Sequence, residues 1–248
     1  MTPLEKFNQL FKRGKAVMGM IHLKGEGRED VLARAAREVH LLLDNGVDAV
    51  IIENYFGSPE DVAGVLERLQ DELPDALYGV NVLDDDALGF RYAREYRAKF
   101  IQLDSVAGHL APGEDALFGK NIAKWRAETD ALVLGGVRFK YQPYNSGRSL
   151  EEDLAIGMRR CDAIVVTGDG TGEPTPMEKI REFRRIIGDF PLIVGAGITP
   201  DTCGEQLAMA DGAIVGSYFK DTHVDNGDVD PGHVKDFMRA VAECGAGG

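Results

Sequence analysis

Short apolar runs alternate with amphipathic segments along almost the whole chain. An opening segment carries Leu4, Phe7, Leu10 and Phe11 on one face, which predicts an N-terminal helix. The run over 16–23 that follows is apolar apart from the histidine near its end. Short apolar runs predict buried strands, and segments with apolar residues every three or four positions predict helices. The chain therefore begins with a helix that leads into a strand.

The same strand–helix alternation then repeats eight times. We predict strands over 16–23, 47–53, 78–83, 100–104, 131–140, 163–167, 192–194 and 212–215. We predict helices over 28–45, from Ser58 onward, and over 85–97, 114–129, 150–160, 176–187, 200–208 and 232–243. Strict alternation specifies a parallel sheet covered by helices, and eight units favour closure. The predicted fold class is α/β: a (β/α)8 TIM barrel with parallel strands and an N-terminal amphipathic helix.

Length and composition agree with one domain. The chain has 248 residues, 44% of them apolar, and barrels of this kind typically contain about 250 residues. No linker or low-complexity segment divides the sequence, so we expect a single TIM-barrel domain over 1–248. No G-x-G-x-x-G motif follows the first predicted strand, which weakens the alternative of an open dinucleotide-binding sheet.

The net charge limits the classes of partner. At −13, the chain lacks the basic surface that displaces counterions from nucleic acid or binds an anionic membrane. Segment 1–14 is interrupted by charges, and no later apolar run approaches about 18 residues, so we expect neither a signal peptide nor membrane insertion. Cys161, Cys203 and Cys244 lack metal or redox spacing. We expect reduced thiols and a cytoplasmic location.

Two glycine-rich segments near the end of the chain predict a phosphate site. Gly195 and Gly197 follow the seventh predicted strand, and Gly216 and Ser217 follow the eighth. Glycine lets backbone amides approach a ligand, and a helix start adds a partial positive charge. The loops after strands 7 and 8 frequently bind phosphate in TIM barrels. We expect a small phosphorylated substrate to bind there.

Polar residues close most of the other apolar runs. They are His22, Glu53, Asn54, Asn81, Asp104, Lys140, Thr167 and Lys220. Active sites of TIM barrels lie at the carboxyl ends of the strands, so these side chains are expected to surround one cup. We expect the catalytic residues, Lys140, Glu53, Asp104 and His22, to act there.

Two chemistries fit these residues. Lys140 can form a Schiff base with a sugar carbonyl or neutralise a phosphate, a role for which Lys220 and Arg138 compete. Glu53, Asp104 and His22 can move a proton beside a carbonyl. The same three can hold a divalent metal. The spacing of these residues does not distinguish acid–base chemistry from metal binding. No cofactor is therefore assigned, and Mg²⁺ or Mn²⁺ stays an alternative.

Two long loops are expected to border the cup. The segment 167–176, with Thr167, Gly168, Thr171 and Gly172, is rich in glycine and hydroxyl groups, which favours a lid or a second anion cradle. The segment 104–115 contains His109, which we interpret as a surface residue rather than a base.

Several motifs resemble the BtpA/SgcQ family. They are the segments 19–23, 47–55, 79–83 and 163–168, the pair Thr171-Gly172, the two glycine-rich segments, and 215–220. The resemblance runs from about Lys15 to Met238. It implies a phosphate-binding TIM barrel. The family takes its name from a member implicated in photosystem I biogenesis, and its SgcQ branch is associated with sugar utilisation, so the resemblance implies no single reaction.

The resemblance also implies a set of site residues. The family's recurrent positions fall on His22, Glu53, Asn54, Asn81, Lys140, Thr167, Gly168, Thr171, Gly172, Gly195, Gly197, Gly216, Ser217 and Lys220. Three segments depart from the family pattern. Residues 24–27 replace a proline-rich turn that the family often has after the first strand, and residues 84–86 replace a more basic stretch after the third strand. Tyr141 stands where a histidine commonly follows the family's lysine, here Lys140. These departures affect substrate contacts and proton transfer.

The leading hypothesis is an enzyme of phosphorylated sugar or small-metabolite metabolism, a lyase of aldolase type or an isomerase. The first alternative is a phosphoribosyl or nucleotide-sugar enzyme that requires Mg²⁺ or Mn²⁺. The second is a non-catalytic assembly factor, of the photosystem I biogenesis type, or a ligand sensor. Barrels of this kind often associate through their outer helices, which suggests a homo-oligomer.

Overall fold

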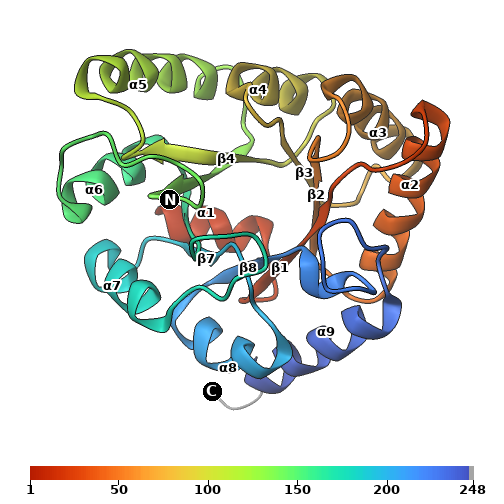
Figure 1. Cartoon of the computed structure of the whole chain (residues 1–248). Coiled ribbons are helices and arrows are strands. Elements are labelled where there is room, and N and C mark those ends of the chain that lie inside the picture. Colours follow the sequence, from red (N-terminus) through yellow and green to blue (C-terminus); the bar gives the residue numbers. More distant parts are fainter. Residues whose placement is uncertain (246–248) are drawn as a thin grey trace.

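The eight predicted strands close into a parallel barrel. The computed structural model describes residues 1–245, in which the strand order is β1-β2-β3-β4-β5-β6-β7-β8, with β8 paired to β1 (Figure 1). The strands are β1 (Ala16–Ile21), β2 (Ala49–Glu53), β3 (Tyr78–Asn81), β4 (Phe100–Ala107), β5 (Leu132–Val137), β6 (Ala163–Val166), β7 (Leu192–Val194) and β8 (Gly212–Val215). The predicted fold class is therefore confirmed.

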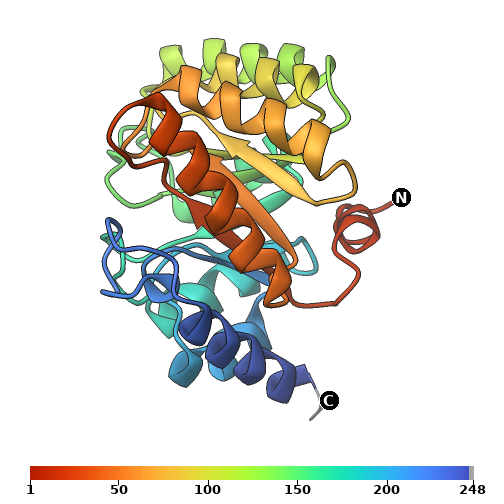
Figure 2. The ribbon, with the colours of Figure 1, turned by 90° about the vertical axis from the view of Figure 1, so that its right-hand side faces the viewer.

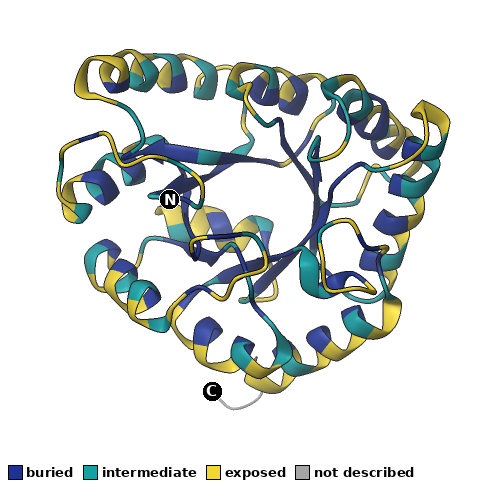
Figure 3. Cartoon of the chain, viewed as in Figure 1, coloured by how far each residue is buried: buried dark blue, intermediate teal, exposed yellow. Residues whose placement is uncertain are grey.

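Helices form a ring around the barrel. They are α2 (Arg28–Asp44), α3 (Pro59–Glu72), α4 (Asp86–Glu95), α5 (Pro112–Arg126), α6 (Leu150–Arg160), α7 (Met177–Ile187), α8 (Pro200–Met209) and α9 (Pro231–Gly245), with a short 3-10 helix η1 (Ser217–Phe219). Each presents a buried stripe to the strands and an exposed face to solvent (Figure 3). This pattern is the one that the apolar spacing predicts.

Local sequence signals start several of these helices. Ser58 caps α3: its hydroxyl accepts a hydrogen bond from the Asp61 amide at 3.1 Å, and the Asp61 carboxylate accepts one from the Ser58 amide at 3.0 Å. Pro59 occupies the first turn, where its missing N–H is not needed. The predicted start of this helix is confirmed.

The N-terminal helix α1 (Pro3–Leu10) closes the end of the barrel where the strands begin (Figure 2). Phe7 and the adjacent Phe11 are almost fully buried, and the Phe11 ring meets Phe100 of β4 with centroids 5.6 Å apart. These rings belong to the apolar cluster that fills the barrel interior. This packing fills the interior of the barrel at the end where the strands begin.

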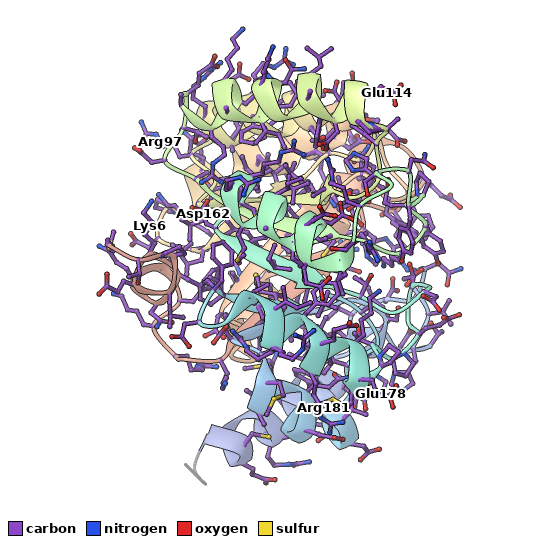
Figure 4. The ribbon with its side chains drawn as sticks, turned by 90° about the vertical axis from the view of Figure 1, so that its left-hand side faces the viewer. Lys6, Arg97, Glu114, Asp162, Glu178 and Arg181 are labelled. Carbon is purple, nitrogen blue, oxygen red and sulfur yellow. The ribbon has the colours of Figure 1, made fainter. Side chains whose placement is uncertain are left out.

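Many charged side chains lie on the outer surface, whereas Asp162 is buried. Figure 4 shows Lys6 of α1, Arg97 and Asp162 near the end where strands begin, and Glu114 and Glu178 toward the other end. No helix in residues 1–245 is long and apolar enough to cross a membrane. Cys161 and Cys203 are buried and unbridged, and the Cys203 sulfur lies 3.8 Å from that of Cys244.

Two of the strand ends that differ from the prediction shape the site. β4 continues to Ala107, and its register with β5 shifts between Leu103 and Ala107. β5 ends at Val137, so Lys140 lies in the following loop. The irregularity brings the Asp104 carbonyl oxygen to 2.1 Å from where a Cβ on Gly136 would stand. Only glycine fits this position, and its absence of a side chain lets β4 hold Asp104 at the rim.

We predict that Gly136→Ala lowers the free energy of unfolding by about 1–3 kcal/mol, because the added methyl must displace backbone. Gly113→Ala is the control, since a Cβ there meets nothing within 4 Å, and it should change stability by less than about 1 kcal/mol. Urea unfolding of both variants measures the difference. Equal stability of the two variants would contradict this account of the β4 irregularity.

Candidate active site

A cavity of about 220 Å³ opens at the carboxyl ends of the strands. It is lined by Met20, His22, Glu53, Tyr55, Leu83, Asp84, Gln102, Asp104, Phe139, Lys140, Tyr141, Thr171, Gly172, Gly195, Ala196, Gly197, Ile214, Gly216 and Ser217. The four predicted catalytic side chains are among them. Because parallel strands all end at one rim, side chains from distant parts of the sequence meet here.

Two carboxyl groups in the cavity share one amide. The Asn81 Nδ2 donates to Glu53 Oε1 at 2.7 Å and to Asp104 Oδ1 at 3.2 Å. Glu53 is buried. Burial, with the nearby Asp104 carboxylate adding to it, raises the pKa of Glu53 from an ordinary 4.5 to about 8. Burial also raises the pKa of Asp104. Glu53 is therefore mostly protonated at neutral pH.

His22 lies beside Glu53 in the opposite protonation state. Its Nε2 is 3.7 Å from Glu53 Oε2, and its Nδ1 is 3.2 Å from the backbone oxygen of Asp225. A carbonyl oxygen only accepts, so Nδ1 carries the hydrogen and Nε2 presents a lone pair to Glu53. Burial, with the Lys220 charge adding to it, lowers the pKa of His22 to about 4. The imidazole is therefore neutral at pH 7.

Lys140 brings a cation to the same cavity. Its backbone N–H donates to Thr167 Oγ1 at 2.9 Å, and its Nζ donates to Thr171 Oγ1 at 2.8 Å. Thr171 is fixed in turn, because its backbone N–H donates to the Tyr141 hydroxyl at 2.8 Å. These contacts direct the lysine from the β5 loop toward the loop that follows β6.

The glycine-rich segments form a cradle of backbone amides next to the cavity. Among residues 1–245, the backbone N–H groups of Gly197, Gly216 and Ser217 donate to no protein acceptor. Gly197 has a φ of +63°, and a Cβ there would lie 2.1 Å from the Glu173 carbonyl oxygen. Backbone amides without a protein acceptor beside a cavity are available to bind an anion.

A second hollow of about 320 Å³ continues from the first. The two share Gly172, Gly197, Gly216 and Ser217, and the second extends to Thr199 at the start of α8. A helix start carries a partial positive charge. A phosphate group held between the shared residues would place the rest of a ligand in the cavity with Glu53 and Lys140.

Some predicted binding residues lie behind the cavity instead of lining it. Lys220 is only 1% exposed, and its Nζ lies 3.1 Å from Glu38 Oε2 of α2. Burial lowers its pKa. The prediction that Lys220 reaches a ligand thus needs correction: an ion pair holds it below the β8 loop, where its charge acts on His22.

Four other predicted residues have supporting contacts. Asn54 Oδ1 accepts from the Leu83 N–H at 2.8 Å and so ties the β2 and β3 loops together. Asn81 and Thr167 act through Glu53, Asp104 and Lys140, as described above. A Cβ on Gly168 would lie 3.0 Å from the Pro174 oxygen, so this glycine serves the turn of its own loop.

The loop 167–176, predicted to border the cup, packs against the β7 loop. The Thr175 hydroxyl donates to the Ala196 oxygen at 3.1 Å, and Glu173 is the residue that approaches Gly197. His109 differs from its prediction as a surface residue. It is partly buried against Phe118, with Nδ1 2.8 Å from the Ser105 hydroxyl, and it lies outside the cavity.

The structure brings to the site four groups that were not predicted as site residues from the sequence, although Asp84 lies in the segment 84–86 noted there. Tyr55, Gln102 and Asp84 line the cavity. Asp225, from the loop before α9, accepts from the Ser217 hydroxyl at 2.6 Å and from the Tyr55 hydroxyl at 3.3 Å. Asp84 directly follows a predicted strand and Tyr55 lies two residues after one, so position near a strand end could have found them. Asp225 carries no such signal.

The described part of the chain has no preformed set of metal ligands that would support the metal alternative. Residues 1–245 contain no group of three His, Cys, Asp or Glu side chains placed to hold a metal ion. Between the two carboxyl groups of the cavity, the N–H groups of Asn81 occupy the positions that face both.

Solved barrels of several activities share this fold. An archaeal fructose 1,6-bisphosphate aldolase superposes with a TM-score of 0.64 at 15% identity, over all of both chains. A (S)-3-O-geranylgeranylglyceryl phosphate synthase from Thermoplasma acidophilum gives 0.62 at 15% identity, covering 98% of this chain and 99% of that one. At such identities the likeness concerns the fold alone.

Sequence relatives extend over nearly the full length. The photosystem I biogenesis protein BtpA of Synechocystis sp. is 28% identical over 263 residues, covering 95% of this chain and 91% of that protein. An uncharacterised protein of Methanocaldococcus jannaschii is 27% identical over 246 residues, covering 89% and 92%. The model of the BtpA family matches residues 13–243. This chain belongs to the BtpA family.

Proposed function

We propose that this protein is an enzyme that moves a proton beside the carbonyl of a small phosphorylated metabolite, as isomerases and aldolases do. One observation carries the proposal. Glu53 and the neutral His22 have pKa values shifted in opposite directions within 3.7 Å of each other, beside a cradle of unpaired amides. Such pairs mark acid–base sites.

The cradle accounts for the first part of the reaction. Amides of Gly197, Gly216 and Ser217 would bind the phosphate, so that its binding energy positions the carbonyl at the other end of the substrate. The cavity and the hollow share these residues. A phosphate therefore lies within one short metabolite's length of the acid–base pair.

Glu53 is the proposed base. A carboxylate with a pKa near 8 is far more basic than an ordinary one, and it would take the proton from the carbon next to the carbonyl. The Lys140 ammonium would stabilise the negative charge that develops on the carbonyl oxygen. Neutral His22, through its Nε2 lone pair, would accept the proton of a neighbouring substrate hydroxyl.

An enediolate forms on either of two routes. In isomerisation, Glu53 removes the proton from the carbon next to the carbonyl and returns it to the former carbonyl carbon, while His22 passes the hydroxyl proton to the former carbonyl oxygen. In carbon–carbon bond cleavage no such carbon is deprotonated first: His22 accepts the proton of the hydroxyl on the carbon β to the carbonyl, the bond between the α and β carbons breaks to give an aldehyde and the enediolate, and the Glu53 acid protonates the enediolate carbon. Both use the same three side chains, and an aldolase is among the solved barrels that share the fold of this chain.

We predict that inorganic phosphate stabilises the wild type and Gly172→Asn, but not Gly172→Asp. Gly172 has a φ of +76°, which Asn and Asp tolerate better than other side chains, and a Cβ there meets only Ser217 at 3.4 Å. The two variants differ in one charge beside the cradle. Thermal unfolding with phosphate, against sodium chloride at equal ionic strength, measures the effect.

A ligand at 100 times its Kd adds about 2.7 kcal/mol of stability, so the shift is measurable. An equal phosphate-induced shift in both variants would refute the cradle.

We predict that the enzyme exchanges the α-hydrogen of a phosphorylated ketose or aldose with solvent deuterium, detected by NMR. Glu53→Gln should slow exchange by about 10²–10⁴-fold. Because the reactive form is the carboxylate, kcat/KM should rise tenfold per pH unit up to about 8 and then level off. His40→Gln, on α2 and outside the cavity, is the control.

No exchange with any sugar phosphate that stabilises the wild type would contradict the proposal and favour a non-catalytic role. A covalent adduct on Lys140 after borohydride treatment with substrate would replace the proposed charge-stabilising role of Lys140 with a Schiff base.

A further inference from the structure

Tyr141 has a backbone conformation that tyrosine seldom adopts. The Gln142 N–H donates to the Phe139 carbonyl oxygen at 3.1 Å and closes a turn whose two central residues are Lys140 and Tyr141. Tyr141 has a φ of +62°. The third residue of a turn with positive φ is ordinarily glycine or asparagine, because a bulky side chain there is strained. Strain retained at a bulky residue points to a use for its side chain.

The side chain that this turn presents is exposed and yet held in place. Tyr141 is 72% exposed, and it lines the cavity. Its hydroxyl oxygen accepts a hydrogen bond from the Thr171 N–H at 2.8 Å. An aromatic ring that stays exposed contributes little to stability through burial, so packing does not account for a tyrosine at this position. The hydroxyl group is the part of the side chain that the protein fixes.

Thr171 also connects Tyr141 to Lys140. Lys140 Nζ donates to Thr171 Oγ1 at 2.8 Å and lies 6.0 Å from the centroid of the Tyr141 ring. The Tyr141 hydroxyl and the Lys140 ammonium therefore meet the same residue at the mouth of the cavity. A phenol oxygen that accepts one hydrogen bond still has its own hydrogen to donate. Two donors of the β5 loop thus lie close together beside the ligand space.

The groups around the Tyr141 hydroxyl make it more acidic than an ordinary phenol. Hydrogen bonds from Thr171 lower the pKa of Tyr141 below its usual value of 10.0, and the Lys140 charge adds to this effect. The Asp225 carboxylate opposes it. Tyr55, whose hydroxyl donates to Asp225 Oδ2 at 3.3 Å, is the other titratable group on this side of the mouth. The cation and the Thr171 donors outweigh the carboxylate.

We propose that the Tyr141 hydroxyl is a second donor to the oxygen that gains negative charge in the reaction, beside the Lys140 ammonium. In the enediolate this atom is the former carbonyl oxygen, which would accept a hydrogen bond from Tyr141 without taking its proton. Donors already in place at such an oxygen stabilise the transition state. This inference rests on the proposed function, because it takes an enediolate as the intermediate. It makes Tyr141 a catalytic residue.

The first test removes the hydroxyl. Exchange of the α-hydrogen with solvent deuterium is followed by NMR for dihydroxyacetone phosphate, ribulose 5-phosphate and fructose 6-phosphate. With whichever of the three the wild type exchanges fastest, Tyr141→Phe should lower kcat by about 10²-fold and change KM little, as expected for the loss of one oxyanion donor.

Tyr144→Phe is the matched control. Tyr144 belongs to the same loop, is 57% exposed and does not line the cavity. Its hydroxyl donates to the Arg138 carbonyl oxygen at 3.3 Å. We expect Tyr144→Phe to leave kcat unchanged. An equal loss of kcat in both variants would show a general effect of the loop and overturn the inference.

The second test separates donation to the substrate from a structural role. Difluorotyrosine at position 141 keeps the ring and the acceptor for the Thr171 N–H, but it loses its phenol proton at lower pH because fluorine withdraws electrons. A phenolate cannot donate, so the fall of kcat at alkaline pH should move to lower pH than in the wild type. If the hydroxyl only holds Thr171, the phenolate still accepts that hydrogen bond and the fall does not move, which overturns the inference.

Failure here is distinguishable from failure of the proposed function. If the wild type exchanges none of the three sugar phosphates, the proposed function fails and the inference fails with it. If the wild type exchanges one of them and Tyr141→Phe has the same kcat, only the inference fails. Difluorotyrosine is close to tyrosine in size, so the second test decides even where Tyr141→Phe does not fold.

Discussion

Burial of the Glu53 carboxyl group is the constraint on which the site depends. A carboxylate taken out of water is strongly disfavoured unless it is paired, so the group keeps its proton to well above its ordinary pKa. The chain supplies a single amide, from Asn81, and places a second carboxyl group on the other side of that amide. The result is a proton held where a substrate would bind.

The barrel supports this arrangement of the Glu53, Asn81 and Asp104 side chains. Phe7, Phe11 and Phe100 fill its interior from the α1 end. The polar groups at the other rim therefore lie above a packed apolar core. The buried pair of Lys220 and Glu38 supports the β8 loop from behind, and the Lys220 charge helps keep His22 neutral. The Glu53–His22 pair and the amides of the β7 and β8 loops therefore belong to one framework, in which the β6 loop contacts both the β7 and β8 loops.

Much of this was readable from the sequence. Apolar periodicity gave the closed barrel, and the rule that strands end at one rim brought His22, Glu53, Asp104 and Lys140 into one cavity. That they are catalytic stays a prediction. Strand ends were less accurate, because the β4 irregularity depends on tertiary contact between Gly136 and Asp104.

Three features of the site depend on contacts between distant parts of the chain, and so they could not be predicted from the sequence. Lys220 and Glu38 are 182 positions apart in the sequence. The residues near Lys220 in the sequence therefore do not show that an ion pair with Glu38 holds it behind the site. Gln102 sits inside a strand, and only the three-dimensional structure shows that it lines the cavity. Asp225 lies in an irregular loop, whose fold places its backbone oxygen on His22 and its carboxylate on Ser217 and Tyr55.

The most direct test is the titration of Glu53 itself. The protein would be labelled with ¹³Cδ-glutamate, its carboxyl signals followed by NMR from pH 4 to 9, and the Glu53 signal assigned by its loss in Glu53→Gln. The account predicts a pKa of about 8 that falls in Asp104→Asn, because the Asp104 charge adds to the effect of burial. A Glu53 signal that titrates near its ordinary 4.5 would contradict the central claim.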